Sequence, residues 1–306
     1  MQDFDLVVVG AGVAGLTAAT FAARHGLKVV VVERMGAGGQ IVNAESIENF
    51  PGFPQGIAGH ELGPLLHEQA ETAGAEVRLD SVEAIELAGA HRIVRAAAEA
   101  LRARAVIIAA GSAPRALGVP GEEALRGRGV SHCAACDGPL LAAQEVCVIG
   151  GGDSALDEAL VLARHAAQVT VFHRDARFTA QQALQDKAAA TRNIELSPET
   201  SVEEILGQDC VCGVRLRALR TGESRVQEVK GVFIQVGLAP NTAFLRGMLA
   251  LDASGHIQTD ALMRTSVEGI FAAGDIRTDS VAQLAAAAGD GATAAISAFR
   301  YLGHAG

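Results

Sequence analysis

The stretch Leu6-Val7-Val8-Val9-Gly10-Ala11-Gly12-Val13-Ala14-Gly15 decides the fold of this chain. Its four leading apolar residues predict a buried strand, and the glycines that follow predict a tight turn. The alanine-rich run up to His25 predicts a helix that stops at Gly26, and the apolar run from Val29 to Val32 predicts a second strand. The segment therefore reads as a complete strand–helix–strand unit of the dinucleotide-binding type.

Each glycine of this turn has a separate task in such a unit. Gly10 permits the bend, Gly12 lets the backbone approach a pyrophosphate, and Gly15 lets the helix pack on the strand. Glu33 ends the second strand, where a carboxylate accepts hydrogen bonds from a ribose diol. We therefore expect these four residues to bind an adenine dinucleotide, the alternative being a coincidental glycine pattern.

A second unit of the same kind begins 140 residues later. Strands are predicted at Val146–Ile149 and Val169–Phe172, with a glycine turn and a helix through His165 between them. A shift of 140 places Gly10 on Gly150 without a gap in the unit. Two tandem dinucleotide folds are therefore expected. In the second fold the expected nucleotide-binding residues are Gly150, Gly152, Asp153, Ser154, His173 and Arg174.

The ribose end of the second unit gives conflicting signals. Glu33 of the first unit maps onto His173, so the ribose-binding acid is missing from that position. Arg174 would pair with a 2′-phosphate and favour NADPH, whereas Asp175 would repel a phosphate and favour NADH. A nucleotide fold that has lost nucleotide binding is the third possibility.

Two further apolar runs are expected to close the first sheet. Val106–Ala110 and Gly269–Ala273 each end in glycine, at Gly111 and Gly274, as strands do on approaching a ligand. Asp275 follows the second run and would hydrogen-bond a cofactor hydroxyl from the strand end. We include Gly111, Gly274 and Asp275 among the cofactor-binding residues.

Turn-forming segments bracket the second unit. Residues 111–115 and 237–241 both contain proline and suit crossings between domains. We therefore expect an α/β protein of two Rossmann-like, three-layer dinucleotide-binding domains, one inserted in the other. The outer domain would comprise 1–113 and 240–306, and the inserted domain 114–239.

The final segment, Gln283 to Leu302, reads as an alanine-rich helix. Glycines flank Asp290 on both sides, so we expect an interruption there and close packing against backbone or cofactor.

A dithiol lies just before the second glycine turn, in Cys133-Ala134-Ala135-Cys136-Asp137-Gly138. Two cysteines on one helical turn can close a disulfide, and a helix N-terminus stabilises a thiolate. Asp137 is placed to supply a proton when the disulfide opens, although an aspartate before glycine also suits a helix cap. The competing interpretation is a zinc half-site completed by Cys210 and Cys212, but no nearby histidine completes a usual ligand pattern. We expect redox chemistry and no metal.

Composition narrows the functional classes. The chain has 306 residues and a formal net charge of −10, which opposes binding to nucleic acid or to an anionic membrane. The uncharged stretch from Leu6 to Ala23 is broken by glycines and reads as strand, turn and helix rather than a membrane span. Five cysteines without a disulfide-scaffold composition favour the cytoplasm.

The chain resembles the low-molecular-weight thioredoxin reductase family over nearly its whole length. The motifs that carry the resemblance are Gly10–Gly15, Gly38–Gln40, Glu48–Gly52, Cys133–Gly138, Gly150–Ala155 and Thr265–Asp275. The resemblance implies FAD in the outer domain, around Gly10, Gly12, Gly15, Glu33, Gly39, Gln40, Asn49, Gly111, Gly274, Asp275 and Gln283. It also implies a homodimer, with Cys136 facing the flavin and Cys133 attacking the partner disulfide.

The function implied is electron transfer from NADPH or NADH through FAD and the dithiol to a thioredoxin-like or peroxiredoxin-linked protein. The chain departs from the family at Asp175 and Thr179, where arginines are usual, and at Ala282, where the family has an arginine before the glutamine. Residues 136–140 and 184–187 are similar to the NADH-using flavoprotein subunit of alkyl hydroperoxide reductase. A ferredoxin-driven disulfide reductase or an oxygen-dependent dithiol oxidase is the alternative on the same flavin and dithiol core.

Overall fold

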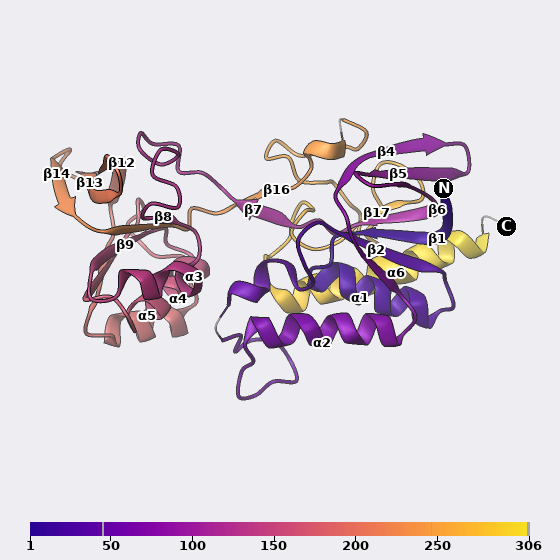
Figure 1. Ribbon diagram of the computed structural model, residues 1–306, viewed down its shortest axis with the longest axis horizontal. Helices are drawn as coiled ribbons and strands as arrows, with labels where there is room; N and C mark the ends of the chain where they lie inside the picture. The colour runs from indigo at the N-terminus through magenta and orange to yellow at the C-terminus, as the bar shows by residue number, and fades with distance from the viewer. Residues whose placement is uncertain (45, 246, 305–306) are drawn as a thin grey trace. The chain divides into compact units, whose positions relative to one another are not determined.

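The computed structural model describes residues 1–44, 46–245 and 247–304. The chain divides into two compact units, and each is described by itself (Figure 1). The first unit comprises Met1–Ala113 and Ala239–Gly306, and the second comprises Pro114–Leu238. The first crossing falls at the residue expected from the sequence, and the second falls one residue earlier than expected.

The first unit is built on a seven-stranded sheet, five strands of which run parallel. The order of these five is β3 (Glu76–Leu79), β2 (Val29–Glu33), β1 (Gln2–Val9), β6 (Ala100–Ile108) and β17 (Ile270–Ala272). The last two strands contain the apolar runs that were predicted to close the sheet, and they pair with each other in parallel. That prediction is confirmed.

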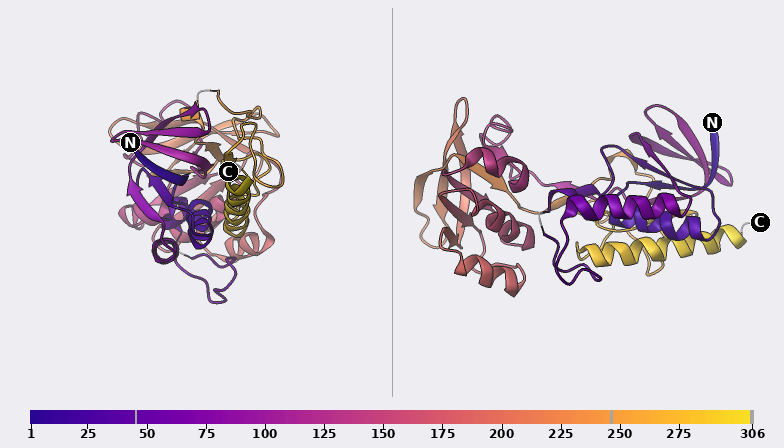
Figure 2. Two further views of the ribbon diagram at one scale, coloured as in Figure 1. Left: turned by 90° about the vertical axis from the view of Figure 1, so that its right-hand side faces the viewer. Right: turned by 60° about the horizontal axis from the view of Figure 1, so that its bottom comes forward.

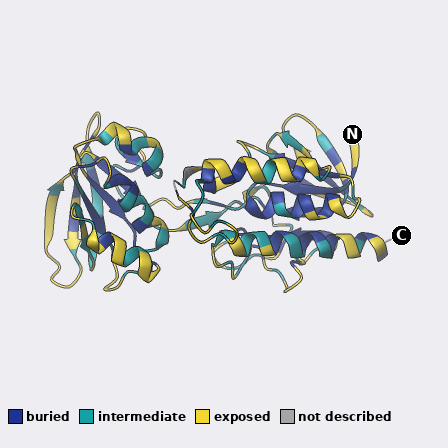
Figure 3. Ribbon diagram, turned by 90° about the horizontal axis from the view of Figure 1, so that it is seen from below, coloured by how far each residue is buried: buried dark blue, intermediate teal, exposed yellow. Residues whose placement is uncertain are grey.

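Layers cover both faces of this sheet. Helices α1 (Val13–Arg24), α2 (Gly59–Thr72) and α6 (Leu284–His304) lie on one face (Figures 1 and 2). The antiparallel hairpin of β4 (Val82–Ala88) and β5 (His91–Ala96) continues the same sheet, because β5 pairs with β6, and its apolar side chains join the core on the other face. Alternate residues of β1 serve the two sides, because successive side chains of a strand point to opposite faces. The faces of α1 and α6 that meet the sheet are buried and their outer faces exposed (Figure 3).

Helix α6 runs without a break through Gly289 and Gly291, so the expected interruption at Asp290 is wrong. The expected close packing is present, because a Cβ on Gly291 would lie 2.2 Å from the carbonyl oxygen of Ala14 in α1. The glycine therefore lets two helices approach rather than ending one of them.

The second unit repeats the arrangement. Its parallel sheet has the order β11 (Ile194–Ser197), β10 (Gln168–Phe172), β9 (Glu145–Ile149), β15 (Gly231–Ile234) and β8 (Val130–Ser131). The first two strands of both units share one register. Leu6 pairs with Val29 and, 140 residues on, Val146 pairs with Val169.

The layers of the second unit are also helices on one side and antiparallel strands on the other. The helices are α3 (Ala134–Asp137), α4 (Asp153–Leu162) and α5 (Gln182–Ala190), and the strands are β12 (Thr200–Gly207), β13 (Val211–Ala218) and β14 (Ser224–Glu228) (Figure 1). Helix α4 ends three residues before His165, the end predicted from the sequence. The α/β class with two Rossmann-like domains is confirmed.

Short elements complete the chain. They are η1 (Gly39–Asn43), β7 (Ser112–Pro114), η2 (Gly138–Leu141), β16 (Leu238–Pro240) and η3 (Ala243–Leu245). None of the helices in the described ranges has the length and apolarity needed to cross a bilayer.

Candidate functional site

Three glycines shape the turn between β1 and α1, each in its own way. Gly10 has φ +102°, and a Cβ there would lie 2.4 Å from the carbonyl oxygen of Ala109. A Cβ on Gly15 would lie only 1.9 Å from the carbonyl oxygen of Gly10. A Cβ on Gly12, in contrast, would meet no protein atom within 4 Å. Gly10 and Gly15 are therefore required by packing, whereas Gly12 leaves an open surface at the start of α1.

Glu33 is fixed beside this turn at the end of β2. Its Oε2 accepts a hydrogen bond from the backbone N–H of Ala11 at 2.8 Å, and its Oε1 accepts one from the N–H of Met35 at 2.9 Å. A carboxylate oxygen has more than one acceptor position, so both oxygens can also accept from hydroxyl groups. Two backbone donors thus aim the carboxylate that was predicted to bind a ribose.

A cavity of about 460 Å³ opens between these residues within the first unit. Among the predicted cofactor residues, those that line it are Gly10, Gly12, Glu33, Gly39, Gln40, Gly111, Gly274 and Asp275. No side chain caps the N-terminus of α1. A cavity that joins the Glu33 carboxylate to an uncapped helix N-terminus offers a hydrogen-bond acceptor and an anion-binding position, the two features expected of a dinucleotide site.

Three predicted residues lie outside the lining of this cavity. Gly15 lies beneath the turn, where it allows the close packing described above. Asn49 and Gln283 are hydrogen-bonded to each other, since the Asn49 side-chain amide donates to Gln283 Oε1 at 3.0 Å.

Gln40, which lines the cavity, donates from Nε2 to the carbonyl oxygen of Ser112 at 3.1 Å, and this hydrogen bond holds its side chain at the cavity wall.

An acid network supports the strand end at Gly274. Asp275 accepts a hydrogen bond from the Ser280 hydroxyl at 2.9 Å. Burial raises the pKa of Asp275, and the nearby Asp290 carboxylate raises it further, against the opposing effect of the Ser280 hydrogen bond. Asp290 Oδ2 accepts from the Gly274 N–H at 3.1 Å and from Arg277 Nε at 2.5 Å. The buried Asp290 therefore fixes the loop that carries Asp275.

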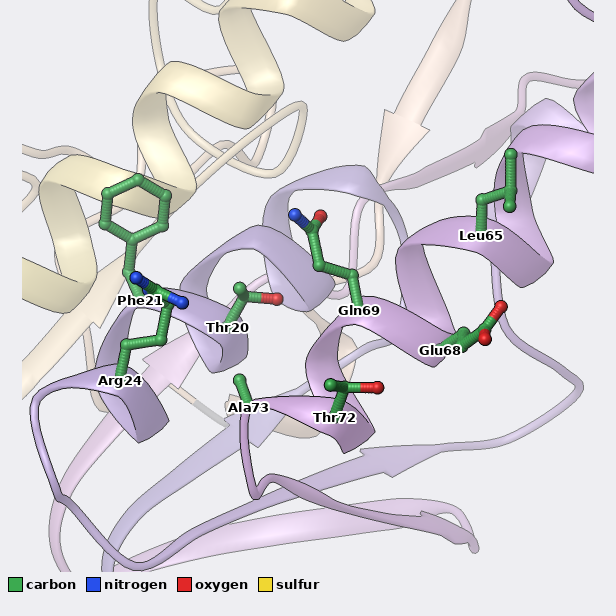
Figure 4. Close-up of a pocket in the computed structure, with 8 residues that line it drawn as sticks. All are labelled: Thr20, Phe21, Arg24, Leu65, Glu68, Gln69, Thr72 and Ala73. Atoms are coloured by element: carbon green, nitrogen blue, oxygen red, sulfur yellow. The ribbon is translucent and has the colours of Figure 1, made fainter.

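A second hollow of about 660 Å³ lies between α1 and α2 (Figure 4). It is lined by Thr20, Phe21, Arg24, Leu65, Glu68, Gln69, Thr72 and Ala73. Phe21 and Leu65 expose large apolar side chains there, while Arg24 and Glu68 carry opposite charges. None of the residues predicted to bind cofactor contributes to this hollow.

Cys133 and Cys136 are joined in a disulfide across α3, with 5.4 Å between their Cα atoms. Cys133 is the N-cap of the helix, and its Sγ accepts a hydrogen bond from the Cys136 N–H at 3.2 Å. Cys136 is exposed and Cys133 is half-buried. A helix N-terminal N–H directed at sulfur is the arrangement that stabilises a thiolate.

Contacts with three other segments hold the dithiol in place. The Cys133 N–H donates to Ser131 Oγ at 3.0 Å, and the His132 ring Nδ1 lies 2.8 Å from the carbonyl oxygen of Ile234 in β15. The N–H of the fully buried Ala134 donates to the carboxylate of Glu158 in α4. The sulfur pair is therefore set on a rigid base formed by the sheet and α4.

Asp137 lies at the end of α3, directly after Cys136. Its N–H donates to the Cys133 carbonyl at 3.1 Å, and its side chain makes no capping hydrogen bond to η2, the helix that it precedes. The helix-cap interpretation of this residue is therefore not supported.

The glycine turn of the second unit has the same backbone bonding as the first. The Gly150 N–H donates to the Phe172 carbonyl at 2.9 Å, as the Gly10 N–H does to Val32 at 2.8 Å. A Cβ on Gly150 would lie 2.2 Å from the carbonyl oxygen of Gln235, whereas one on Gly152 would meet only Thr179 Oγ1, at 3.8 Å.

The side chains around this turn are arranged differently from those of the first. Asp153, in the first turn of α4, accepts from the Gln181 N–H at 2.7 Å and from Gln181 Nε2 at 2.5 Å, and Ser154 is exposed. His173 is buried with its ring over Gly151, because a Cβ on Gly151 would lie 2.3 Å from His173 Nδ1. Arg174 is exposed at the end of β10. The predicted residues of this unit thus lie together at the carboxyl ends of β9 and β10.

The remaining cysteines are free thiols. Cys147 lies in the core of β9, where burial raises the pKa of its thiol, and Cys210 and Cys212 are exposed. Across the described ranges, no three His, Cys, Asp or Glu side chains are grouped so that they could hold a metal ion.

Sequence reasoning missed Asp290, Glu158 and Ser131. Asp290 had a visible signal, since a single acid within an alanine-rich apolar helix is unusual unless it has buried partners. Glu158 and Ser131 had none, because their contacts with the dithiol segment depend on tertiary packing.

Comparisons with known proteins agree with this geometry. Residues 4–291 match the pyridine nucleotide-disulphide oxidoreductase family. The chain is 43% identical over 299 residues to a thioredoxin reductase of Mycolicibacterium smegmatis, covering 97% of this chain and 96% of that protein. It is also similar to the crystal structure of Lactococcus lactis thioredoxin reductase, with TM-score 0.96, 39% identity and coverage of 98% and 99%. The T. acidophilum thioredoxin reductase structure gives TM-score 0.94 with 37% identity over 98% of this chain and 99% of that one.

Proposed function

The chain belongs to the pyridine nucleotide-disulphide oxidoreductase family, among its thioredoxin reductases, and from this premise we propose how its own residues divide the reaction. It is a flavin-dependent disulfide oxidoreductase that passes electrons from a reduced nicotinamide dinucleotide through FAD and Cys133–Cys136 to a thioredoxin-like protein disulfide. The observation that carries the proposal is the Cys133–Cys136 disulfide at the start of a helix, in a chain with two dinucleotide-binding folds. The full-length relatives are thioredoxin reductases, so a ferredoxin-driven or oxygen-dependent reaction is not favoured.

The residues of the first unit fit FAD. Gly12 presents a bare backbone at the uncapped start of α1, and Glu33 presents a carboxylate aimed by two backbone donors. These features suit a pyrophosphate and a ribose, and Gln40, Gly111, Gly274 and Asp275 line the rest of the same cavity. FAD, when bound, supplies a carrier that takes a hydride from nicotinamide and delivers two electrons to a disulfide.

The dithiol then exchanges with the protein substrate. One cysteine, as thiolate, attacks a sulfur of the partner disulfide and forms a mixed disulfide, and the partner's other sulfur leaves as a thiolate. The second cysteine attacks the mixed disulfide, which restores Cys133–Cys136 and releases the reduced partner. Each leaving thiolate takes up a proton, and we assign Asp137 as the residue that relays it, since it directly follows Cys136 and its side chain does not cap η2.

The surface around the dithiol favours a folded protein as substrate. Cys136 is exposed, and Leu140, four residues on, is 81% exposed. An exposed leucine beside a reactive disulfide suits the apolar centre of a protein–protein interface. We propose thioredoxin as the partner, and a peroxiredoxin-linked protein as the second candidate.

The decisive experiment is an anaerobic titration of the FAD-loaded protein with NADH and, separately, with NADPH. The flavin absorbance band should bleach with at least one of them, and added thioredoxin disulfide should restore it. Cys133→Ser and Cys136→Ser should keep FAD bound and bleachable but lose the reduction of thioredoxin. Failure of both nucleotides to bleach the flavin, or turnover retained in either variant, would refute the scheme.

We also propose a homodimer that uses the α1–α2 hollow. In a two-fold symmetric interface the same surface patch of both subunits meets itself. Arg24 of one subunit could then pair with Glu68 of the other, and Glu68 with Arg24, around the exposed side chains of Phe21 and Leu65. Sedimentation should give a dimer, and Leu65→Glu should dissociate it. The matched substitution of exposed Leu79 on β3, Leu79→Glu, should leave it intact, and a monomeric wild-type protein would contradict the assignment.

We propose the cytoplasm as the location. Three cysteines, Cys147, Cys210 and Cys212, are free, and two of these are exposed, which suits a compartment that keeps thiols reduced.

A further inference from the structure

The two dinucleotide folds of this chain can be compared position by position, because their first two strands pair in the same register. In the first fold Glu33, at the end of the second strand, presents a carboxylate to the ribose position. His173 stands at the corresponding place in the second fold, but its ring is buried over Gly151. The ring Nε2 lies 3.0 Å from the carbonyl oxygen of Arg177, which can only accept, so Nε2 carries a proton and donates to it. His173 therefore shapes the turn and is not available to a ribose.

The next side chain that can bind a ribose diol is that of Asp175. It is 63% exposed, and its Oδ2 lies 3.5 Å from His173 Nε2. This exposure and this distance leave its carboxylate oxygens open to further donors from solvent or from a ligand. Asp175 thus offers the acceptor that His173 does not.

The charges near Asp175 disfavour a phosphate. Arg174 is 80% exposed, and the only acid paired with it in the described structure is Asp175, with 3.8 Å between Arg174 Nε and Asp175 Oδ2. The N–H of a second acidic residue, Glu199, donates to the Asp175 carbonyl at 3.2 Å, so another acid follows β11 at the same edge. A 2′-phosphate dianion at this edge would have to approach the Asp175 carboxylate, which lies between it and any contact with Arg174.

Neither arginine of this loop, Arg174 or Arg177, is held by a side-chain hydrogen bond in the part of the chain that the structure describes. Tight recognition of phosphate uses an arginine fork held in place, often together with a second donor. Arg174 and Arg177 are both exposed, and Thr179 is bonded to the turn, its Oγ1 donating to the Gly151 carbonyl at 3.2 Å. The Thr179 hydroxyl therefore donates its proton to the backbone and not to a phosphate.

We infer that the second unit recognises an adenine ribose without a 2′-phosphate, with Asp175 as the residue that sets this preference, so that NADH is the preferred electron donor. The inference rests on the proposed function and names the substrate of its nucleotide fold. Asp175 acts by accepting hydrogen bonds from the 2′- and 3′-hydroxyls and by repelling a phosphate at the 2′ position.

The test uses two probes that differ only in the 2′-phosphate. Calorimetric titration of the FAD-loaded protein with 5′-AMP and with 2′,5′-ADP gives a ratio of dissociation constants that needs no turnover. We expect 5′-AMP to bind at least as tightly as 2′,5′-ADP, and kcat/KM to be higher for NADH than for NADPH. Binding of 2′,5′-ADP about tenfold tighter than 5′-AMP would overturn the inference and leave the proposed reductase function standing.

A charge reversal locates the effect. Asp175→Arg should shift the ratio about tenfold or more toward 2′,5′-ADP, because it replaces a repelling carboxylate with a charge-assisted donor. Asp209→Arg, at an exposed acid between β12 and β13 of the same unit, is the matched control and should leave the ratio unchanged. An unchanged ratio in Asp175→Arg would refute the role of Asp175. If neither probe binds and neither nucleotide bleaches the flavin, the proposed donor fails together with this inference.

Discussion

Gly12→Ala should separate the folding of the first unit from its capacity to bind FAD. Gly12 has φ −73° and ψ −177°, an extended conformation that alanine adopts freely. The added Cβ would meet no protein atom within 4 Å. Alanine is a poorer N-cap than glycine by about 0.5–1 kcal/mol. It also restricts the unfolded chain, which returns about 0.4–1 kcal/mol. The free energy of unfolding of the apoprotein should therefore change by less than about 0.5 kcal/mol.

The same methyl group should weaken FAD binding strongly. It would project into the space at the N-terminus of α1, where the pyrophosphate is proposed to accept backbone hydrogen bonds. Loss of one hydrogen bond to a charged group costs about 1.5–3 kcal/mol. Because 1.4 kcal/mol is a factor of ten, the dissociation constant of FAD should rise by about 10- to 150-fold.

Urea unfolding of the apoprotein and FAD titration by fluorescence quenching measure the two quantities. Gly15→Ala is the contrasting variant, since its Cβ would lie 1.9 Å from a backbone oxygen that cannot move aside. It should lose stability by about 1–3 kcal/mol or more as well as FAD binding. Wild-type affinity for FAD in Gly12→Ala would show that the anion does not lie over Gly12. A loss of stability equal to that of Gly15→Ala would show that the surface over Gly12 is not open.

Three further predictions follow from the site geometry. Asp275 has a raised pKa in the folded protein, so its contribution to stability is fully present at low pH and is lost as pH rises through that pKa. Asp275→Asn should therefore make the apoprotein more stable than wild type at pH 7. The difference in stability should disappear in acid, where Asp275 is protonated in both the folded and the unfolded protein. A stability difference independent of pH would contradict this. Glu158→Ala should lower the free energy of unfolding by about 1–3 kcal/mol, because it leaves the buried N–H of Ala134 without an acceptor, while Glu158→Gln should retain most of the stability; equal losses in urea titrations would argue against the acceptor role. If Cys133 attacks the partner, mixing reduced Cys136→Ser with thioredoxin disulfide should trap a mixed disulfide that is visible by non-reducing electrophoresis. Cys133→Ser should trap none. The opposite result would show that Cys136 is the attacking cysteine.

The two strand–helix–strand units could be predicted because their signals are local. A strand followed by glycines, a helix and a strand determines its own packing within about thirty residues. The shift of 140 residues predicted equal registers, and Leu6–Val29 and Val146–Val169 show them. The dithiol was similarly predictable, since Cys133 and Cys136 are adjacent on any helical turn.

Partners distant in the sequence could not be predicted. Glu158 lies 24 residues from Ala134, and only the packing of α3 on α4 brings its carboxylate to that N–H. Asp290 meets Gly274 and Arg277 because α6 returns alongside the strand end. The glycines beside Asp290 were read as a break, because sequence alone does not distinguish a glycine that ends a helix from one that admits a neighbouring helix.

The sequence by itself determined that this chain folds as two dinucleotide-binding units and carries a redox dithiol, because period, glycine position and cysteine spacing act over one or two turns of chain. Only the tertiary structure decided how the acid proposed for each ribose position is held. Glu33 is held by the N–H groups of Ala11 and Met35, whereas the His173 ring lies over Gly151 and Asp175 stays exposed beside it. A side chain's direction is set by the hydrogen bonds and packing around it, and these come from segments that meet only in the folded protein.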